Sequence, residues 1–285
     1  MSFAKKLNFG IYCLLFFITS CNIINKHETV PVYIHIDKFT LTTDNNTEGA
    51  NSINVSDAWI NIDANPDEIY ELPATFPELE IGKHKITVRP GIKINGIAAG
   101  RGIYPFYTSY EIDTILLSQS IIQIDPQIKY KDATQFSFIE DFEDPAFELY
   151  ESKSNSDTTI IQLNDTFIQN NKVGAIFLDN DHDNFLCFTD SFTLPRNGTS
   201  IYLEMSYQNN IEFDVGVFSI YNQKTYIPVI SIYPYISGRN KIYIDLTNTI
   251  NSNYATYYKI YFQAIKPSST INAEIILDDI KLLHF

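Results

Sequence analysis

The chain has 285 residues, of which 45% are apolar and 19% are charged, and its formal net charge is −14. The length suggests about two domains, and the apolar share is enough for packed cores, which excludes a wholly disordered chain. The acidic excess excludes non-specific binding to nucleic acids, because that binding needs a basic surface. Three cysteines cannot form a disulfide framework.

The first twenty residues predict a secretory signal. Two lysines at positions 5 and 6 precede an uncharged, largely apolar run over residues 7–20. A retained membrane anchor helix is the alternative, but the run is short for a span, which takes about 20 apolar residues. The run ends in Ile18-Thr19-Ser20-Cys21, which resembles a bacterial lipobox. In that family of signals the cysteine is acylated and becomes the first residue of the mature protein.

The lipobox resemblance implies a signal peptide over residues 1–20, lipid attachment at Cys21 and a tether over residues 21–30. A multiply acylated cysteine is a lasting anchor, so we expect a protein of the cell envelope, held at the outer membrane. No acidic cluster directly follows Cys21. Some surface lipoproteins of the Bacteroidota type carry such a cluster, so the inner and outer faces of that membrane stay open as alternatives.

Alternating apolar and polar residues predict β-strands along the rest of the chain. The alternation is clear at residues 32–36, 213–217, 242–246 and 258–262. Turn-forming residues such as Arg196-Asn197-Gly198 separate these runs. Many short strands at such spacing are typical of β-sandwiches and barrels, so we expect an all-β fold.

A polar stretch at residues 129–136 predicts the boundary between a first domain over residues 31–130 and a second over residues 136–285. In the first domain, a strand that ends at Asp63 is followed by a proline-bearing crossover and by Gly82-Lys83-His84. This order resembles the small, Ig-like PEGA-type β-sandwich. The resemblance implies a spacer or interaction domain without activity. We expect the aromatic residues 104–107 to cover the end of this sandwich.

The second domain begins with the acidic segment 140–144 and ends with Ile276-Leu277-Asp278-Asp279-Ile280. This pairing resembles carbohydrate-binding modules with the galactose-binding-like jelly roll, where such segments lie on neighbouring first and last strands. The resemblance implies a jelly-roll β-sandwich with a structural calcium, whose ligands would be Glu143, Asp144, Asp278 and Asp279. The alternative is that these acids are exposed edge charges that discourage strand aggregation.

Another acidic run offers an alternative calcium site. The positions one, three, five and twelve of an EF-type loop are filled by Asp179, Asp181, Asp183 and Asp190. Position six is Asn184 instead of glycine, and the flanking residues predict strands where that loop has helices. A hairpin turn therefore explains this run better than a calcium loop does.

Four tyrosines suggest a glycan site in the second domain, because aromatic faces stack on sugar rings and phenol groups donate hydrogen bonds. They lie on the strands and turns of residues 220–236, as Tyr221, Tyr226, Tyr233 and Tyr235. The other interpretation is that tyrosine simply fills a two-faced sheet, since tyrosines are spread along the whole chain.

Catalytic motifs are not evident in the sequence. The five histidines are scattered, and Cys187 lies in an alternating strand, where a buried filler is expected. We therefore predict a non-catalytic envelope lipoprotein that acts as a binding or assembly component, with a polysaccharide as one partner of the jelly roll. The alternative is a structural accessory subunit that binds another envelope protein, and a glycan-active enzyme comes third. Structural calcium is the one cofactor expected.

The arrangement as a whole is similar to a family of Bacteroidota lipoproteins that have no assigned activity. That similarity supports two domains and contributes no mechanism.

Overall fold

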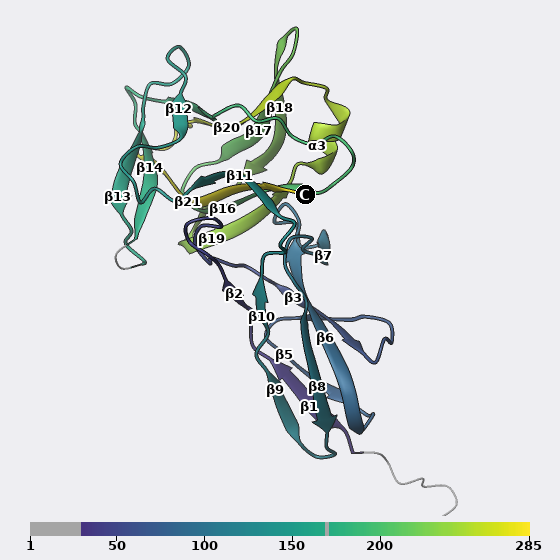
Figure 1. Cartoon of the computed structure of the whole chain (residues 1–285). Helices are drawn as coiled ribbons and strands as arrows, with labels where there is room; N and C mark the ends of the chain where they lie inside the picture. The colour runs from purple at the N-terminus through teal and green to yellow at the C-terminus, as the bar shows by residue number, and fades with distance from the viewer. Residues whose placement is uncertain (1–29, 169–170) are drawn as a thin grey trace, which may run out of the picture.

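The computed structural model describes residues 30–168 and 171–285 (Figure 1). The signal peptide, Cys21 and most of the tether lie outside the described residues. The described chain is built from strands, with one short helix, α3 (Thr247–Ser252), and this confirms the all-β expectation. None of its helices is long and apolar enough to cross a membrane.

The N-terminal part holds ten strands that form three sheets, in the orders β5–β1–β9, β10–β2 and β4–β3–β6, with β7 and β8 both paired to β6. Strand β1 shows why these segments are strands: Val32, Ile34 and Ile36 are fully buried, and the residues between them face outward. The strands are β1 (Val32–Ile36), β2 (Thr40–Thr42), β3 (Asp57–Ile62), β4 (Glu68–Glu71), β5 (Ala74–Glu78), β6 (Gly82–Lys93), β7 (Arg101–Ile103), β8 (Tyr110–Leu116), β9 (Ile121–Ile124) and β10 (Gln127–Lys129).

The C-terminal part is a β-sandwich of two antiparallel sheets. One has the order β13–β14–β21–β16–β19, with β11 also paired to β21, and the other has the order β12–β15–β20–β17–β18. The strands are β11 (Gln135–Glu140), β12 (Leu149–Glu151), β13 (Ile160–Asn164), β14 (Lys172–Leu178), β15 (Asn184–Thr189), β16 (Ile201–Asn209), β17 (Phe213–Ile220), β18 (Lys224–Ile232), β19 (Tyr235–Asp245), β20 (Tyr257–Ile265) and β21 (Ala273–His284). Apolar side chains from both sheets meet between them and form a continuous core.

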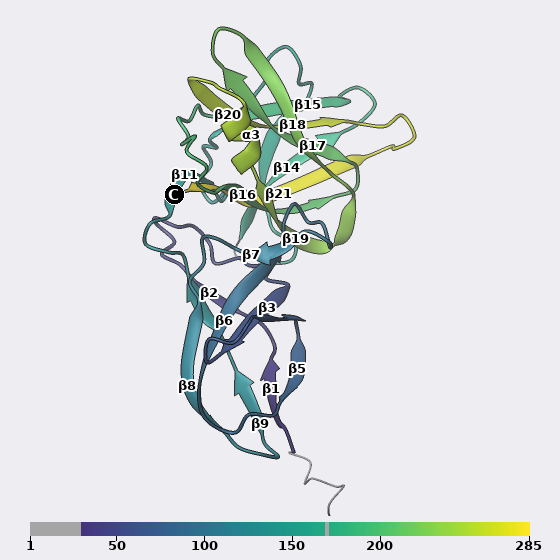
Figure 2. The ribbon, with the colours of Figure 1, turned by 90° about the vertical axis from the view of Figure 1, so that its right-hand side faces the viewer.

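The two parts meet where the ends of β6 and β7 approach β19 (Figure 2). The expected aromatic cover at residues 104–107 lies here, and Tyr104, Phe106 and Tyr107 are buried. The ring of Tyr104 packs against Tyr243 and Tyr202 of the C-terminal part, at centroid distances of 4.7 and 5.4 Å. The core of the N-terminal part therefore continues across the junction into its neighbour.

Backbone hydrogen bonds also cross the junction. The amide of Asn95 donates to the carbonyl of Tyr243 at 2.8 Å, and the amide of Asp245 donates to the side chain of Asn95 at 2.8 Å. Ile94 forms a parallel bridge with Tyr243. These bonds fix the turn that follows β6 against the C-terminal end of β19.

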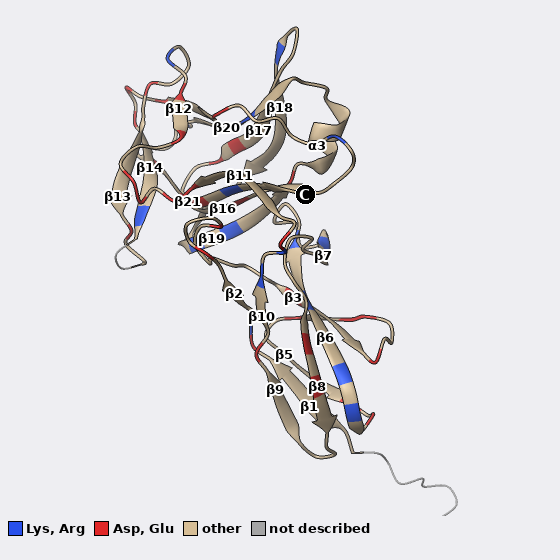
Figure 3. Cartoon of the chain, viewed as in Figure 1, with Lys and Arg blue, Asp and Glu red and all other residues tan. Residues whose placement is uncertain are grey.

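A buried ionic cluster lies at the centre of the junction, where lysines of β19 and β21 meet the N-terminal part (Figure 3). The carboxylate of Glu204 lies 2.8 Å from the Lys241 ammonium and accepts hydrogen bonds from the hydroxyls of Tyr104 and Tyr130, at 2.7 and 3.0 Å. Although burial acts to raise it, the two neighbouring lysines hold the pKa of Glu204 below its usual value. The cluster is therefore charged, and both parts of the chain contribute to it.

Lys281 is the second cation of this cluster. Its ammonium donates to the Ala50 carbonyl at 2.5 Å and to the Tyr130 hydroxyl at 3.3 Å. Burial, together with the nearby Lys241, lowers the pKa of Lys281 to about 8. Its charge therefore depends on the Glu204 carboxylate, which acts in the opposite direction on the same pKa.

Candidate functional site

The outer face of the sheet β12–β15–β20–β17–β18 carries an unusual concentration of aromatic side chains. Along β17 and β20, alternate residues such as Val217 and Ile260 fill the sandwich core. The residues between them point outward, and there Phe218, Tyr261 and Leu186 bury one another. We call the outward set the aromatic face; it consists of Phe188, Phe218, Tyr226 and Tyr261, with Lys224 and Lys259 beside them.

The rings of the aromatic face are in mutual contact. Tyr226 lies 4.7 Å from Phe218 and 5.4 Å from Tyr261, and Phe188 lies 5.2 Å from Phe218, measured between ring centroids. A Cβ atom at Gly216 would come within 2.4 Å of the Tyr261 ring, so the ring lies directly over the glycine backbone. Such contacts hold the rings in place and leave Tyr226 45% exposed.

A shallow hollow of about 440 Å³ opens on this face. It is lined by Phe188, Phe218, Ile220, Tyr226 and the two lysines. Its floor is apolar and its cationic groups are hydrogen-bond donors. A flat apolar floor with donors at its edge can stack on one face of a ring-shaped ligand and bind the polar groups at the edge of that ring.

The four tyrosines expected to bind a glycan are all exposed, but they lie in three places. Tyr226 belongs to the aromatic face. Tyr221 packs instead against Tyr254, with ring centroids 4.8 Å apart. Tyr233 and Tyr235 line a separate hollow of about 240 Å³ near the junction. Tyr207 of the C-terminal part and Asn95 of the N-terminal part also line it.

Most residues of the aromatic face are not evident from the sequence. Phe188, Phe218, Tyr261 and the two lysines were not identified as candidates. A signal was present, since Val217-Phe218 and Ile260-Tyr261-Phe262 are apolar at both positions of the alternation. A strand that is apolar on both faces carries apolar side chains on its outer face as well, and these side chains must also be covered.

The acids expected to bind calcium have other partners in the structure. The carboxylate of Asp278 accepts a hydrogen bond from Asn171 at 2.9 Å and lies 3.8 Å from the guanidinium of Arg239. That guanidinium also donates to the buried Asp165 at 3.0 Å. A protein cation thus lies beside Asp278. Burial, aided by the neighbouring Asp279, raises the pKa of Asp278 to about 8.

The other three candidate ligands are spread around this position. Asp279 accepts from the Ser206 hydroxyl at 3.2 Å, and Glu143 accepts from the amide of Lys172 at 2.8 Å. Asp144 is exposed. A different group in the described ranges brings three metal-ligating side chains within 4.8 Å of one another. It consists of Asp63, Glu80 and His84. Calcium at Glu143, Asp144, Asp278 and Asp279 stays a prediction.

The acidic run at residues 179–190 begins in the connection between β14 and β15, which is residues 179–183. The carboxylate of Asp179 accepts from the amides of Asp181 and His182, at 2.8 and 2.9 Å, so it caps a turn of its own segment. The flanking strands are as expected, but the hairpin is wrong, because β14 and β15 lie in different sheets. Residues 179–183 connect the two layers of the sandwich, and Asp190 follows the last residue of β15.

Cys187 is fully buried in the sandwich core, which confirms the expected structural role. Burial raises the pKa of its thiol, so the thiolate needed for nucleophilic chemistry is disfavoured.

Comparisons with known proteins give a weak structural likeness. No family model matches the chain, and no curated protein matches it. Among solved structures, a family 29 carbohydrate-binding module, CBM29-2, in complex with mannohexaose is 10% identical, with a TM-score of 0.36, over 53% of this chain and 91% of that chain. The CBM22-2 xylan-binding domain of Xyn10C from Paenibacillus barcinonensis is 14% identical, with a TM-score of 0.38, over 52% of this chain and 99% of that chain. About half of the chain thus resembles carbohydrate-binding-module sandwiches, and at these TM-scores the likeness says nothing about its ligand.

Proposed function

We propose that this protein binds carbohydrate through the aromatic face and has no catalytic role. The observation that carries the proposal is the cluster of contacting rings around Tyr226, on the open side of a sheet whose other side already packs a core. Tyr226 is the exposed ring of this cluster, Phe188 is partly exposed, and Phe218 and Tyr261 are nearly buried and support them. Exposed aromatic rings beside a hollow are typical of a binding surface. Pyranose rings present a face of C–H groups that stacks on such side chains, and the hydroxyls at their edges suit the ammonium groups of Lys224 and Lys259.

Replacing Tyr226 with alanine is expected to weaken polysaccharide binding about tenfold, the equivalent of roughly 1.4 kcal/mol of lost stacking. The measurement is titration calorimetry of the purified protein with neutral and uronic-acid-containing polysaccharides. Tyr221→Ala is the matched control, because Tyr221 is 53% exposed and lies outside the aromatic face. Equal losses in the two variants, or no binding across the panel, would contradict the proposal and favour an envelope protein as the partner.

The proposal includes a lipid anchor at the cell envelope. In the described chain, β1 begins at one end of the molecule, and β17 and β18 lie at the opposite end (Figure 1). A tether ahead of β1 would therefore place the N-terminal part between the membrane and the aromatic face. On this arrangement the N-terminal part is a spacer that holds the binding face outward.

Metabolic labelling tests the anchor directly. Labelled palmitate is expected to enter the wild-type protein and to be absent from Cys21→Ala, since acylation needs the lipobox cysteine. Cys13→Ala is the control, because Cys13 lies in the predicted signal peptide and should leave the label unchanged. Label retained in Cys21→Ala would rule out the lipobox.

A further inference from the structure

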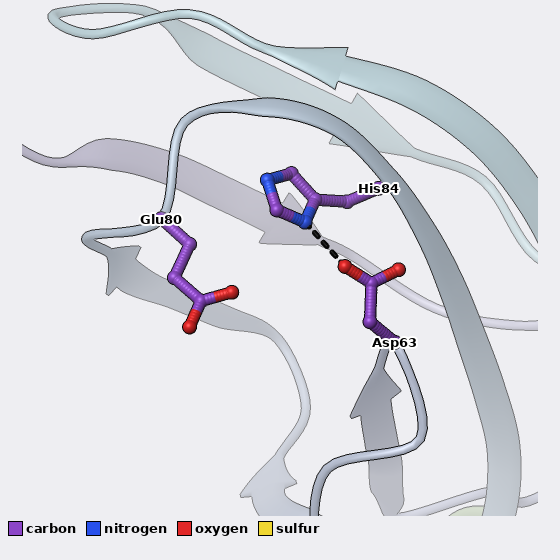
Figure 4. A group of neighbouring side chains, drawn as sticks. All are labelled: Asp63, Glu80 and His84. Carbon is purple, nitrogen blue, oxygen red and sulfur yellow. Dashed lines mark hydrogen bonds and ion pairs between the residues drawn. The ribbon is translucent and has the colours of Figure 1, made fainter.

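A second group of ligand-type side chains lies in the N-terminal part, away from the aromatic face (Figure 4). Asp63 directly follows β3, Glu80 lies in the short connection between β5 and β6, and His84 is near the start of β6. One ligand atom from each residue lies within 4.8 Å of the other two. The residues are brought together because β3 pairs with β6, and the β5–β6 connection is short.

Asp63 is held rigidly by the backbone around it. One of its carboxylate oxygens accepts the amide of Lys85 at 2.8 Å, and its own amide donates to the Lys85 carbonyl at 3.0 Å. These bonds fix the residue in a left-handed conformation, with φ of 49°. The Lys85 amide and the adjacent His84 lower the pKa of Asp63, which keeps it ionised. Its second oxygen, Oδ2, points toward His84 (Figure 4).

His84 is also held in place. It lies on the same side of β6 as the buried Ile86, whereas Lys83 and Lys85 lie on the other side of the strand. Its side chain is 11% exposed, and Nδ1 lies 2.6 Å from Asp63 Oδ2. Its buried Nε2 atom has the backbone of Ile81 beside it and no side-chain partner among the described residues. One nitrogen ligand, His84 Nδ1, and one oxygen ligand, Asp63 Oδ2, are thus already held close together.

Glu80 completes the group from the exposed side. Its amide donates to the side chain of Glu78 at 2.8 Å, which orders the turn, while the Glu80 carboxylate accepts no hydrogen bond from the described residues. The Lys85 ammonium, on the other side of β6, lies 2.7 Å from Glu111. The carboxylate of Glu80 is therefore available to a ligand between itself, Asp63 and His84.

We propose that Asp63, Glu80 and His84 bind a divalent transition-metal ion of the zinc type, with water in the remaining position. One imidazole nitrogen and two carboxylates suit zinc and its neighbours, whereas calcium takes six to eight oxygens and magnesium keeps an all-oxygen shell. The metal would take the place of the proton at His84 Nδ1: a neutral imidazole would then carry its single proton on Nε2, and an imidazolium would release its Nδ1 proton to solvent. The ion would link the β3 end, the β5–β6 connection and β6.

The test is a titration of the purified, metal-free protein with Zn²⁺, and with Co²⁺ as a spectroscopic probe. We expect one ion per chain, a raised melting temperature and visible cobalt absorption. Glu80→Gln should weaken zinc binding at least tenfold and leave the metal-free melting temperature unchanged, because Glu80 is exposed. His84→Gln should abolish the cobalt spectrum.

His182→Gln is the matched control. His182 and Asp179 form an exposed pair of the same kind, with 3.1 Å between Nδ1 and Oδ1, but among the described residues no third ligand joins them. This variant should bind zinc as the wild type does. Zinc affinity that is equal in wild type and Glu80→Gln, or calcium binding as tight as zinc binding, would overturn the proposal.

Discussion

Replacing Glu204 with glutamine is expected to lower the free energy of unfolding by about 3–5 kcal/mol. Glu204 and Lys281 are fully buried and Lys241 is 6% exposed. Removal of the carboxylate therefore leaves the Lys241 ammonium without its ion-pair partner and lowers the pKa of Lys281 further, in a site that water does not reach. The hydroxyls of Tyr104 and Tyr130 would also lose an ionised acceptor. Urea denaturation followed by fluorescence measures the loss.

Glu111→Gln is the control for this prediction. Glu111 also lies beside a lysine, with 2.7 Å between its carboxylate and the Lys85 ammonium, but both side chains are more than half exposed. Exposed ion pairs contribute little, so a loss below about 1 kcal/mol is expected. Equal losses in the two variants would show that the buried Glu204 cluster contributes no more to the free energy of unfolding than an exposed ion pair does.

The Glu204 variant should also change the shape of the unfolding curve. The carboxylate lies on β16 in the C-terminal part, and two of its hydrogen-bond donors lie in the N-terminal part. Loss of this link weakens the coupling between the two parts, so the variant is expected to unfold in two separate transitions. A single sharp transition in the variant would mean that the aromatic contacts of Tyr243 and its neighbours couple the parts without the ionic cluster.

Replacing Asp278 with asparagine is expected to change how stability depends on pH. Burial, with help from Asp279, raises the pKa of Asp278 from 3.8 to about 8 in the folded protein. Between these values the folded state keeps a proton that the unfolded state has lost. Wild-type stability should therefore fall as pH rises, by up to about 1.4 kcal/mol per pH unit from this group. Asparagine does not titrate, so the stability of the variant should not show this decrease with pH.

The measurement is urea denaturation of both proteins between about pH 5 and pH 9. The stability of Asp278→Asn relative to wild type should rise with pH and level off above about pH 8, the folded-state value for Asp278. Asp132→Asn serves as the control, since the Asp132 side chain is 97% exposed and should give no pH-dependent difference. A difference that stays constant across the range would mean that Asp278 is ionised beside Arg239 throughout.

The inward-facing residues of the strands could be predicted from the sequence. The alternation of apolar and polar residues predicts that Ile34 in β1, Val215 in β17 and Ile260 in β20 face a core, and all three are fully buried. The period of two identifies the two faces of a strand, but it does not say what covers the second face. Tyr243 occupies an outward position on β19 and is nevertheless 1% exposed, because the N-terminal part packs over it.

The sites were harder to predict, because each depends on contacts between distant segments. Tyr226 was identified as a candidate, but its partners on the aromatic face come from β15, β17 and β20. The carboxylate of Asp278 was expected near Glu143, and the residues beside it are Asn171 and Arg239 from two other strands or loops. Such pairings follow from sheet order, which periodicity within a single strand does not determine.

The position of β21 has a consequence for how this protein is made. The strand pairs with β11, β14 and β16, and it also supplies Lys281 and Leu283 to the junction. It leaves the ribosome after every strand that it joins. Until then, its partner strands have unpaired backbone edges and exposed apolar side chains. Chaperones bind chains in this state, and proteases cleave them. Chains that stop before residue 273 should therefore be degraded in the cell rather than accumulate as shortened proteins.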